Sequence, residues 1–193
     1  MSLALHEAAR AGDSARIHQL IATGVETDLA DEQGATALMA AAQAGQLEAV
    51  KALLAAGATV DARDGNGWTA LFKAAYNPEL DCGYAPVVQA LIDAGADVNA
   101  RIFFGITPLM LAAGGGEAAV CEALLNAGAE VKATNEHGRT ALQMAKERHW
   151  VDVINLLYEA EGFVMETGGG CSTGARPGPS DAKVVNFMKR PMH

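Results

Sequence analysis

Apolar and polar residues follow a pattern along this chain that returns as a block. In residues 34–66 a Thr-Ala-Leu tripeptide starts at Thr36 and leads into small residues at 40–42, which let a first helix lie close to its neighbours. Four larger apolar residues then fall on one face of a second helix: Leu47, Val50, Leu53 and Leu54. Gly45 suits the turn between the helices, and Gly57 suits a left-handed helix end. The block predicts a helix-turn-helix unit.

The block recurs with a fixed period. The tripeptide has counterparts at Thr69, Thr107 and Thr140, at spacings of 33, 38 and 33 residues. A second marker keeps the same phase: a pair of aliphatic residues, then two further residues, then Gly-Ala. Such repetition predicts a solenoid in which each unit buries its apolar face against the next. We expect units at about 3–33, 34–66, 67–104, 105–137 and 138–162, with an insertion at 77–86 in the third.

These features resemble the ankyrin-repeat family, whose unit of about 33 residues carries a Thr-Pro-Leu-His-x-Ala signature. The resemblance covers residues 3 to about 162. Ala replaces Pro in three of the four tripeptides, and only His6 keeps the histidine. The resemblance implies an all-α ankyrin-repeat solenoid of five helix-turn-helix repeats with hairpin-like turns, followed by a tail at 163–193.

Charge divides the chain into an acidic body and a basic tail. Residues up to Gly162 include 10 basic and 21 acidic side chains, whereas the remainder has 4 and 2. Nucleic acids and anionic membranes bind through clustered Lys and Arg, which this body lacks. We therefore expect neither a nucleic-acid partner nor a membrane partner.

Targeting signals and cysteines indicate the compartment. No apolar run approaches the roughly 18 residues of a membrane span, and MSLALHEAAR becomes charged too early for a signal peptide. Cys121 takes the place that Val50 fills in the second unit, which predicts a buried residue. Cys82 and Cys171 leave two alternatives, a disulfide or a reducing compartment. We expect a soluble, cytoplasmic protein.

Signatures of catalysis are absent from the sequence. There is no nucleophile elbow, no phosphate loop before a helix, no His-Glu-x-x-His and no paired Cys motif. The glycine run at 114–116 falls in phase with a turn between two helices, and the histidines are spread over different units. We therefore expect that this protein is not an enzyme and that it binds no cofactor, metal or small-molecule substrate.

Two segments depart from the repeat. In the insertion, Pro78 and Pro86 exclude a helix interior. This is either a tolerated surface loop or a device by which Tyr76, Leu80 and Tyr84 form a wall at one edge of a binding face.

The second departure is the turn at 101–106, Arg-Ile-Phe-Phe-Gly-Ile, where the sibling turns are polar. Apolar residues gathered in a turn indicate a contact surface. For Trp68 and Ile106 the alternative is packing on adjoining turns within the molecule. Phe103 and Phe104 are expected to contact something else.

The ankyrin resemblance also implies a function. Members of the family grip a protein partner with a concave face built from turn tips and first helices. Carried over to this sequence, the positions expected to bind a partner are Trp68, Lys73, Tyr76, Phe103, Phe104, Ile106, Leu111 and Arg139. We expect a non-catalytic binding module whose acidic concave face holds a protein with a basic surface.

Several roles fit such a module. It resembles stand-alone ankyrin proteins of bacteria, among which a regulatory or immunity protein would inhibit its partner. A multi-client scaffold, a chaperone-like binder and a secreted bacterial effector are alternatives. After a Gly- and Pro-rich linker at 166–181 comes the basic, apolar segment 183–190. It is either disordered or docks on the body, and the docking hypothesis places Phe187 or Met188 against the central aromatic residues.

Overall fold

The computed structural model describes residues 2–77, 82–164 and 188–189. Within these residues the chain forms ten α-helices in five consecutive pairs, which confirms the expected all-α repeat architecture. The pairs are α1 (Ser2–Ala11) with α2 (Ser14–Ala22), α3 (Ala37–Gln43) with α4 (Leu47–Ala55), α5 (Ala70–Ala75) with α6 (Ala85–Asp93), α7 (Pro108–Gly115) with α8 (Ala118–Asn126), and α9 (Ala141–Glu147) with α10 (Val151–Ala160).

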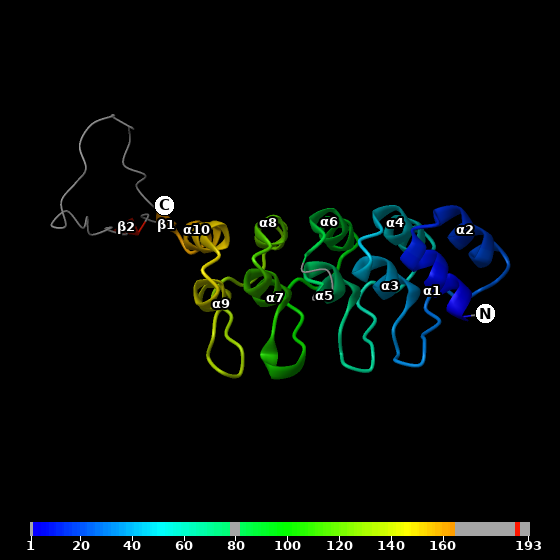
Figure 1. Ribbon diagram of the computed structural model, residues 1–193, viewed down its shortest axis with the longest axis horizontal. Coiled ribbons are helices and arrows are strands. Elements are labelled where there is room, and N and C mark those ends of the chain that lie inside the picture. Colours follow the sequence, from blue (N-terminus) through cyan, green and yellow to red (C-terminus); the bar gives the residue numbers. More distant parts are fainter. Residues whose placement is uncertain (1, 78–81, 165–187, 190–193) are drawn as a thin grey trace, which may run out of the picture.

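The helices stand in two rows (Figure 1). The odd-numbered helices form an inner row in which each contacts the next, and the even-numbered helices form an outer row in the same way. Hairpin-shaped connections lead from each outer helix to the next inner helix and project beyond the inner row (Figure 1). The molecule is therefore an elongated stack with a tip at each of these connections.

Threonine starts most of the inner helices. The Oγ1 atoms of Thr36 and Thr107 accept a hydrogen bond from the backbone N–H three residues later, at 3.4 and 3.3 Å. Thr140 forms a full capping box with Gln143. Thr69 makes no such bond, and its buried hydroxyl has no hydrogen-bond partner. These caps explain why Ala can replace Pro at the first helical position, since Ala is itself a good helix former.

The core runs through the whole stack, and both rows contribute small and large apolar residues to it. Ala41, Ala42 and Ala74 of the inner helices are fully buried, as are Leu53 and Leu91 of the outer helices. Small residues allow neighbouring inner helices to approach closely, while leucines fill the space between the rows.

Cys121 lies fully buried in this core, as the sequence predicted. Burial raises the pKa of its thiol to about 12, and the nearby Glu117 carboxylate acts in the same direction. The thiol therefore stays protonated and packs as a small apolar group.

Aromatic residues ahead of two outer helices pack on the preceding repeat. A Cβ atom at Gly45 would lie 2.4 Å from a ring atom of Tyr84, and one at Gly116 would lie 2.6 Å from Trp150. The Trp150 Nε1–H also donates to the Gly114 carbonyl at 3.1 Å. The absence of a side chain at Gly45 and at Gly116 thus leaves space for the Tyr84 and Trp150 rings. Tyr84 belongs to this packing and lines neither of the hollows described below. The expected wall of Tyr76, Leu80 and Tyr84 stays a prediction, since Leu80 lies outside the described residues.

A short strand pair follows α10. Strand β1 (Phe163–Val164) pairs antiparallel with β2 (Met188–Lys189), and β1 contacts α10. This pairing places Met188 at the C-terminal end of the stack. The expected contact of Met188 with the central aromatic residues is therefore wrong. Phe187 and most of segment 183–190 lie outside the described residues.

Candidate functional site

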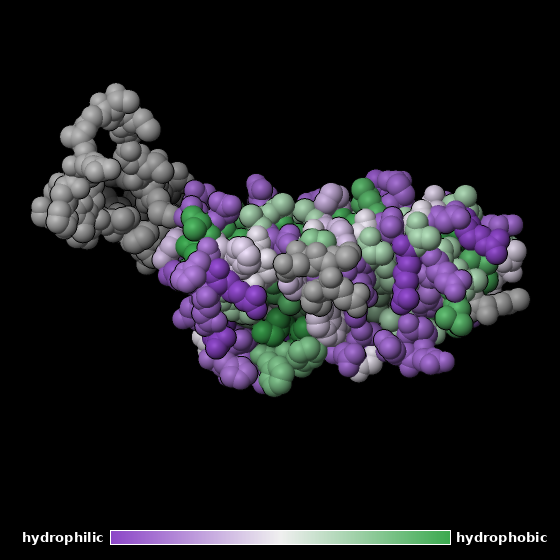
Figure 2. All heavy atoms as spheres, in the orientation of Figure 1, coloured by the Kyte–Doolittle hydropathy of each residue, from purple (hydrophilic) through white to green (hydrophobic). Residues whose placement is uncertain are grey.

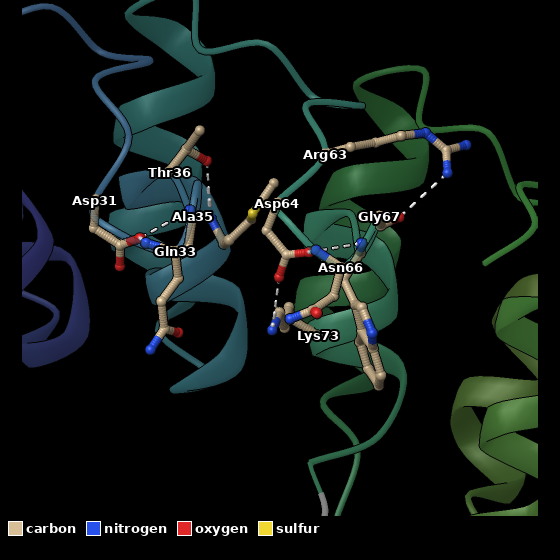
Figure 3. Close-up of polar contacts among 11 residues, drawn as sticks. Asp31, Gln33, Ala35, Thr36, Arg63, Asp64, Asn66, Gly67 and Lys73 are labelled. Atoms are coloured by element: carbon tan, nitrogen blue, oxygen red, sulfur yellow. Dashed lines mark hydrogen bonds and ion pairs between the residues drawn. The ribbon is translucent and has the colours of Figure 1, made fainter. Parts of the chain in front are cut away.

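Among the described residues, the five helix pairs are joined by four connections, and each connection forms a tip (Figure 1). We call them tip 1 (31–35), tip 2 (64–68), tip 3 (102–106) and tip 4 (135–139). In tips 1, 2 and 4 the first side chain is Asp31, Asp64 or Asn135. Its Oδ1 accepts hydrogen bonds from the backbone N–H groups two and four residues later, at 2.9–3.0 Å (Figure 3). This side-chain brace replaces hydrogen bonds that the tight turn cannot make with other backbone groups.

The brace has an electrostatic signature at tip 1. Partial burial alone would raise the pKa of Asp31, but the N–H groups of Ala35 and Gln33 and the nearby His6 and Arg10 lower it below its ordinary value. The ionised carboxylate is thus the form that holds this tip.

Tip 3 lacks the brace. Ile102 stands where the other tips carry Asp or Asn, and it cannot accept a hydrogen bond from the turn. Its side chain is 8% exposed and packs with Phe72 and Ala100. The turn instead forms a short 3₁₀ segment, η1 (Phe103–Gly105). Tip 3 therefore exchanges a polar brace for an apolar anchor.

The exchange comes with an unusual backbone at Phe104. Its φ and ψ angles are 59° and 17°, in the left-handed region. A bulky L-residue held there costs on the order of 1–2 kcal/mol. Phe103 and Phe104 are also 50% and 55% exposed, so neither ring gains full burial in return. Two half-exposed rings on a strained turn mark tip 3 as unusual.

Rings form a continuous row across three tips. The ring centroids of Trp68 and Phe103 are 6.1 Å apart, those of Phe103 and Phe104 5.7 Å, and those of Phe104 and His137 5.9 Å. Figure 2 shows apolar side chains gathered at the lower edge of the body, where Figure 1 places tip 3.

The tips are joined in two pairs. The Gly65 N–H donates to the Gln33 carbonyl at 2.8 Å, which links tips 1 and 2, and the Glu136 N–H donates to the Phe104 carbonyl at 2.9 Å, which links tips 3 and 4. No backbone hydrogen bond joins tips 2 and 3, both of which lie within the described residues. A seam thus lies between tips 2 and 3, bridged by the Trp68 and Phe103 rings.

A hollow opens at this seam. The first hollow has a volume of about 350 Å³ and is lined by Gln43, Asn66, Trp68, Lys73, Tyr76, Asn77 and Phe103. The Lys73 Nζ lies 3.2 Å from a carboxylate oxygen of the buried Asp64 (Figure 3) and 5.0 Å from the centre of the Trp68 ring. Lys73 thus lies beside an aromatic wall of this hollow.

A second hollow lies one repeat further on. It has a volume of about 230 Å³ and is lined by Tyr76, Leu111, Gly114, Gly115, Arg139, Met144, Glu147 and Arg148. Arg139 pairs with Glu147 at 3.1 Å. Tyr76 lines both hollows and therefore divides them.

The insertion places Tyr76 there. Helix α5 ends at Ala75, and Tyr76 adopts an extended conformation, with φ −161° and ψ 127°. Its ring lies over Gly115, where an added Cβ atom would come within 2.4 Å of it. The base of the insertion is closed by hydrogen bonds between the backbones of Asn77 and Cys82, and the Asn77 side chain donates to the Gln43 carbonyl at 2.9 Å. The third repeat thus ends its inner helix early and turns a ring toward the fourth.

The structure brings most of the predicted residues together. Trp68, Lys73, Tyr76 and Phe103 line the first hollow, Tyr76, Leu111 and Arg139 line the second, and Phe104 lies exposed beside them. Ile106 lines neither hollow and packs, half-buried, on the cluster around Phe72. Its placement favours the alternative of packing within the molecule. Trp68 also packs on Phe72, with ring centroids 6.1 Å apart, while still facing the first hollow.

Sequence reasoning missed Gln43, Asn77 and Arg148 as lining residues. A signal existed for Gln43, which follows Thr36 by seven residues, the same spacing that separates Tyr76 from Thr69. None existed for Asn77, because its position depends on how the insertion closes.

Charge is distributed unevenly between the rows. In the second to fifth repeats, segments 31–45, 63–77, 101–115 and 134–148, which hold the tips and inner helices, carry six basic and five acidic residues. Segments 46–62, 82–100, 116–133 and 149–162, which hold the outer helices, carry two and ten. This distribution favours a nearly neutral concave face over the expected acidic one. Net charge alone suggested it, but the carboxylates are concentrated on the outer row.

Other chemistry finds little support in the described part of the chain. No three His, Cys, Asp or Glu side chains there are close enough together to hold a metal ion. No helix among those residues combines the length and apolarity needed to cross a bilayer.

Paired helices stacked in two rows with projecting hairpin tips define a helical repeat protein. The family model for ankyrin repeats (three copies) matches residues 5–102 and 81–166, so the chain belongs to the ankyrin-repeat family. No curated protein matches the chain significantly. Ankyrin repeats are generally protein-protein interaction modules and typically non-catalytic.

Proposed function

We propose that this protein is a non-catalytic module that holds one partner protein at tip 3 and the adjoining inner face, and so regulates or inhibits that partner. The observation that carries the proposal is the pair of half-exposed rings, Phe103 and Phe104, on a strained turn without a polar brace. Backbone strain and exposed aromatic rings both reduce the stability of the free protein, and both are typical of functional contact sites.

The gain available to a partner is substantial. The exposed half of each Phe ring, on the order of 100 Å², contributes about 2 kcal/mol when it is buried. Two adjacent rings therefore reach the energy of an interface hot spot, which is typically a cluster of a few aromatic or Arg residues. Trp68 and His137 extend the cluster on either side.

A single partner is favoured over many weak clients because tip 3 is held in place. The Ile102 N–H donates to the Ile106 carbonyl at 3.0 Å, the Gly105 N–H donates to the Ile102 carbonyl at 3.0 Å, and tip 4 adds the bond to Phe104. Promiscuous binders use surfaces that repack, such as flexible Met-rich ones. A fixed tip suits one complementary pocket, whereas a scaffold or chaperone-like binder would need a pliable one.

Three biological settings fit a surface of this kind. A module that acts by occupying its partner suits a cytoplasmic regulator, an immunity protein or a secreted bacterial effector. The charge argument for an immunity protein weakens, because the acidic residues lie mainly on the outer row and not at the tips.

Affinity capture from cells of the source organism tests the proposal. The full chain serves as bait beside a double variant, Phe103→Ser with Phe104→Asn, in which Asn tolerates the left-handed backbone. Val151→Ser is the matched control, since Val151 is a 62% exposed apolar residue on outer helix α10. We expect one stoichiometric protein on wild type and control and its loss from the double variant. Equal retention by all three baits, or a spread of substoichiometric clients, would refute the proposal.

A further inference from the structure

We infer that the two hollows on either side of Tyr76 bind an extended, acidic segment of the partner protein, with an apolar side chain in the first hollow and a carboxylate beside the arginines that line the second. This inference rests on the proposed function and adds the chemistry of what is bound. It replaces the expected basic partner with one of opposite charge.

The arrangement of the hollows favours an extended segment. Both are lined by inner helices of successive repeats, so an occupant runs across the repeats and along the stack. Packed helices lie about 8–10 Å apart, and an extended chain rises about 3.3 Å per residue. Two anchors about three residues apart therefore match one repeat.

The size of the hollows favours side chains over a whole small molecule. Ligand pockets commonly enclose about 300–1,000 Å³. The hollows measure about 350 and 230 Å³, so the first lies at the lower end of this range and the second below it, and the Tyr76 ring separates them. Each suits one or two side chains of a peptide whose backbone crosses the ring.

The first hollow combines aromatic walls with a positive charge. Trp68 and Phe103 supply apolar surface, and among the described residues that line it only Lys73 is charged. An ammonium group has three N–H donors, so its pairing with Asp64 still allows a carboxylate to approach. An apolar side chain flanked by an acidic residue fits this lining.

The second hollow has apolar and charged lining residues. Leu111 and Met144 are apolar, and the charged residues of the lining are Arg139, Arg148 and Glu147. Arg139 and Glu147 are each about half exposed in their ion pair, with 52% of each side chain exposed, so an incoming carboxylate can compete for the guanidinium. The charged residues of this lining have a net positive charge.

The surroundings have the same sign. Segments 63–77, 101–115 and 134–148, which surround the hollows, contain six basic and three acidic residues. One of the three is Asp64, which is buried against Lys73. Two of the six basic residues act elsewhere, because Arg101 pairs with Glu130 at 3.8 Å and Lys146 lies over the Tyr158 ring. The charged residues that line the two hollows are three basic ones and Glu147, so the lining favours carboxylates, although the whole chain has a net charge of −9.

Long-range repulsion by the outer row is limited. Charges are screened over about 8 Å at physiological ionic strength, while a helix with its side chains is about 10 Å thick. A segment seated on the inner face thus interacts mainly with the tips and inner helices. By the same reasoning the chain's own basic segment 183–190 is a poor occupant.

Selection from a phage library of random twelve-residue peptides on the immobilised full chain tests the inference. We expect enriched sequences to carry an aromatic or aliphatic residue with Asp or Glu about three positions away. A synthetic copy should bind wild type and lose at least about tenfold in affinity in the double variant Arg139→Gln with Arg148→Gln, and it should bind more weakly as salt rises. Lys51→Gln with Lys132→Gln is the matched control, because both of these lysines belong to outer-row segments, and it should change affinity less than about twofold.

Three results would overturn the inference: enrichment of basic peptides, no enrichment above the library, or binding that the two arginines do not affect. Displacement of a selected peptide by a synthetic 183–190 peptide would assign the hollows to the chain's own tail and also overturn it. If capture still yields a protein that depends on Phe103 and Phe104 while the peptide test fails, the proposed function stands and only the acidic segment is wrong. If capture loses that dependence, the proposed function itself fails.

Discussion

The left-handed backbone at Phe104 gives the most specific prediction. With φ at 59°, any residue with a Cβ atom is strained there, whereas glycine is not. Replacing Phe104 by Ala and by Gly removes the ring in both cases. The difference between the two variants therefore isolates the backbone strain from the loss of ring contacts.

The magnitude follows from two opposing effects. At an ordinary position Ala is more stable than Gly by about 0.4–1 kcal/mol, because Gly gains more freedom in the unfolded chain. In the left-handed region the Cβ atom costs about 1–2 kcal/mol. The Phe104→Gly variant should therefore be more stable than the Phe104→Ala variant by about 0.5–1 kcal/mol.

Asn66 is the matched control position. It precedes Thr69 by three residues, as Phe104 precedes Thr107, but it does not have a positive φ. At position 66 Ala should be the more stable of the two replacements. Urea unfolding of the full chain at unchanged m value measures the four variants. If Phe104→Ala equals or exceeds Phe104→Gly in stability, the tip is not strained and the argument from strain fails.

Three further predictions concern other parts of the stack. Gly115→Ala should displace the Tyr76 ring, because its Cβ atom would come within 2.4 Å of that ring. The affinity for a selected peptide, measured by titration, should fall at least about fivefold while the protein stays folded. Unchanged affinity would contradict the dividing role of Tyr76. Cys121, with its pKa raised to about 12, should resist a thiol reagent at pH 8 until the protein unfolds, as mass spectrometry of labelled peptides can show; fast native labelling would be inconsistent with its burial. Because the folded pKa of Asp31 is lowered, its contribution to the free energy of unfolding is present above the unfolded pKa and decreases as pH falls through the folded pKa. Asp31→Asn should therefore reduce the loss of stability on acidification, and an identical acid profile for both proteins would refute this.

The repeat architecture was predictable because each local signal agrees with the others. Thr36 and its counterparts cap helices, Ala41 and Ala42 allow close packing, and the period places these features in register. Tip 3 was also visible as an apolar turn. Its missing brace is equally a sequence feature, since Ile102 aligns with Asp31, Asp64 and Asn135.

The remainder depended on three-dimensional placement. Tyr76 and Tyr84 look equivalent in the insertion, yet one turns toward Gly115 in the next repeat and the other toward Gly45 in the preceding one. The extended backbone at Tyr76 decides this, and no periodic pattern specifies it. The net charge of the inner face could not be predicted for a similar reason. Net charge adds the residues of both rows, whereas a partner meets only one.

The most direct test of the central claim is hydroxyl-radical footprinting of the full chain with and without its captured partner, read residue by residue. If the inner face is the binding surface, oxidation of Trp68, Phe103 and Phe104 falls in the complex while that of Val151 on the outer row does not change. Protection of Val151 and the outer helices, with Phe103 and Phe104 oxidised as in the free protein, would contradict the account.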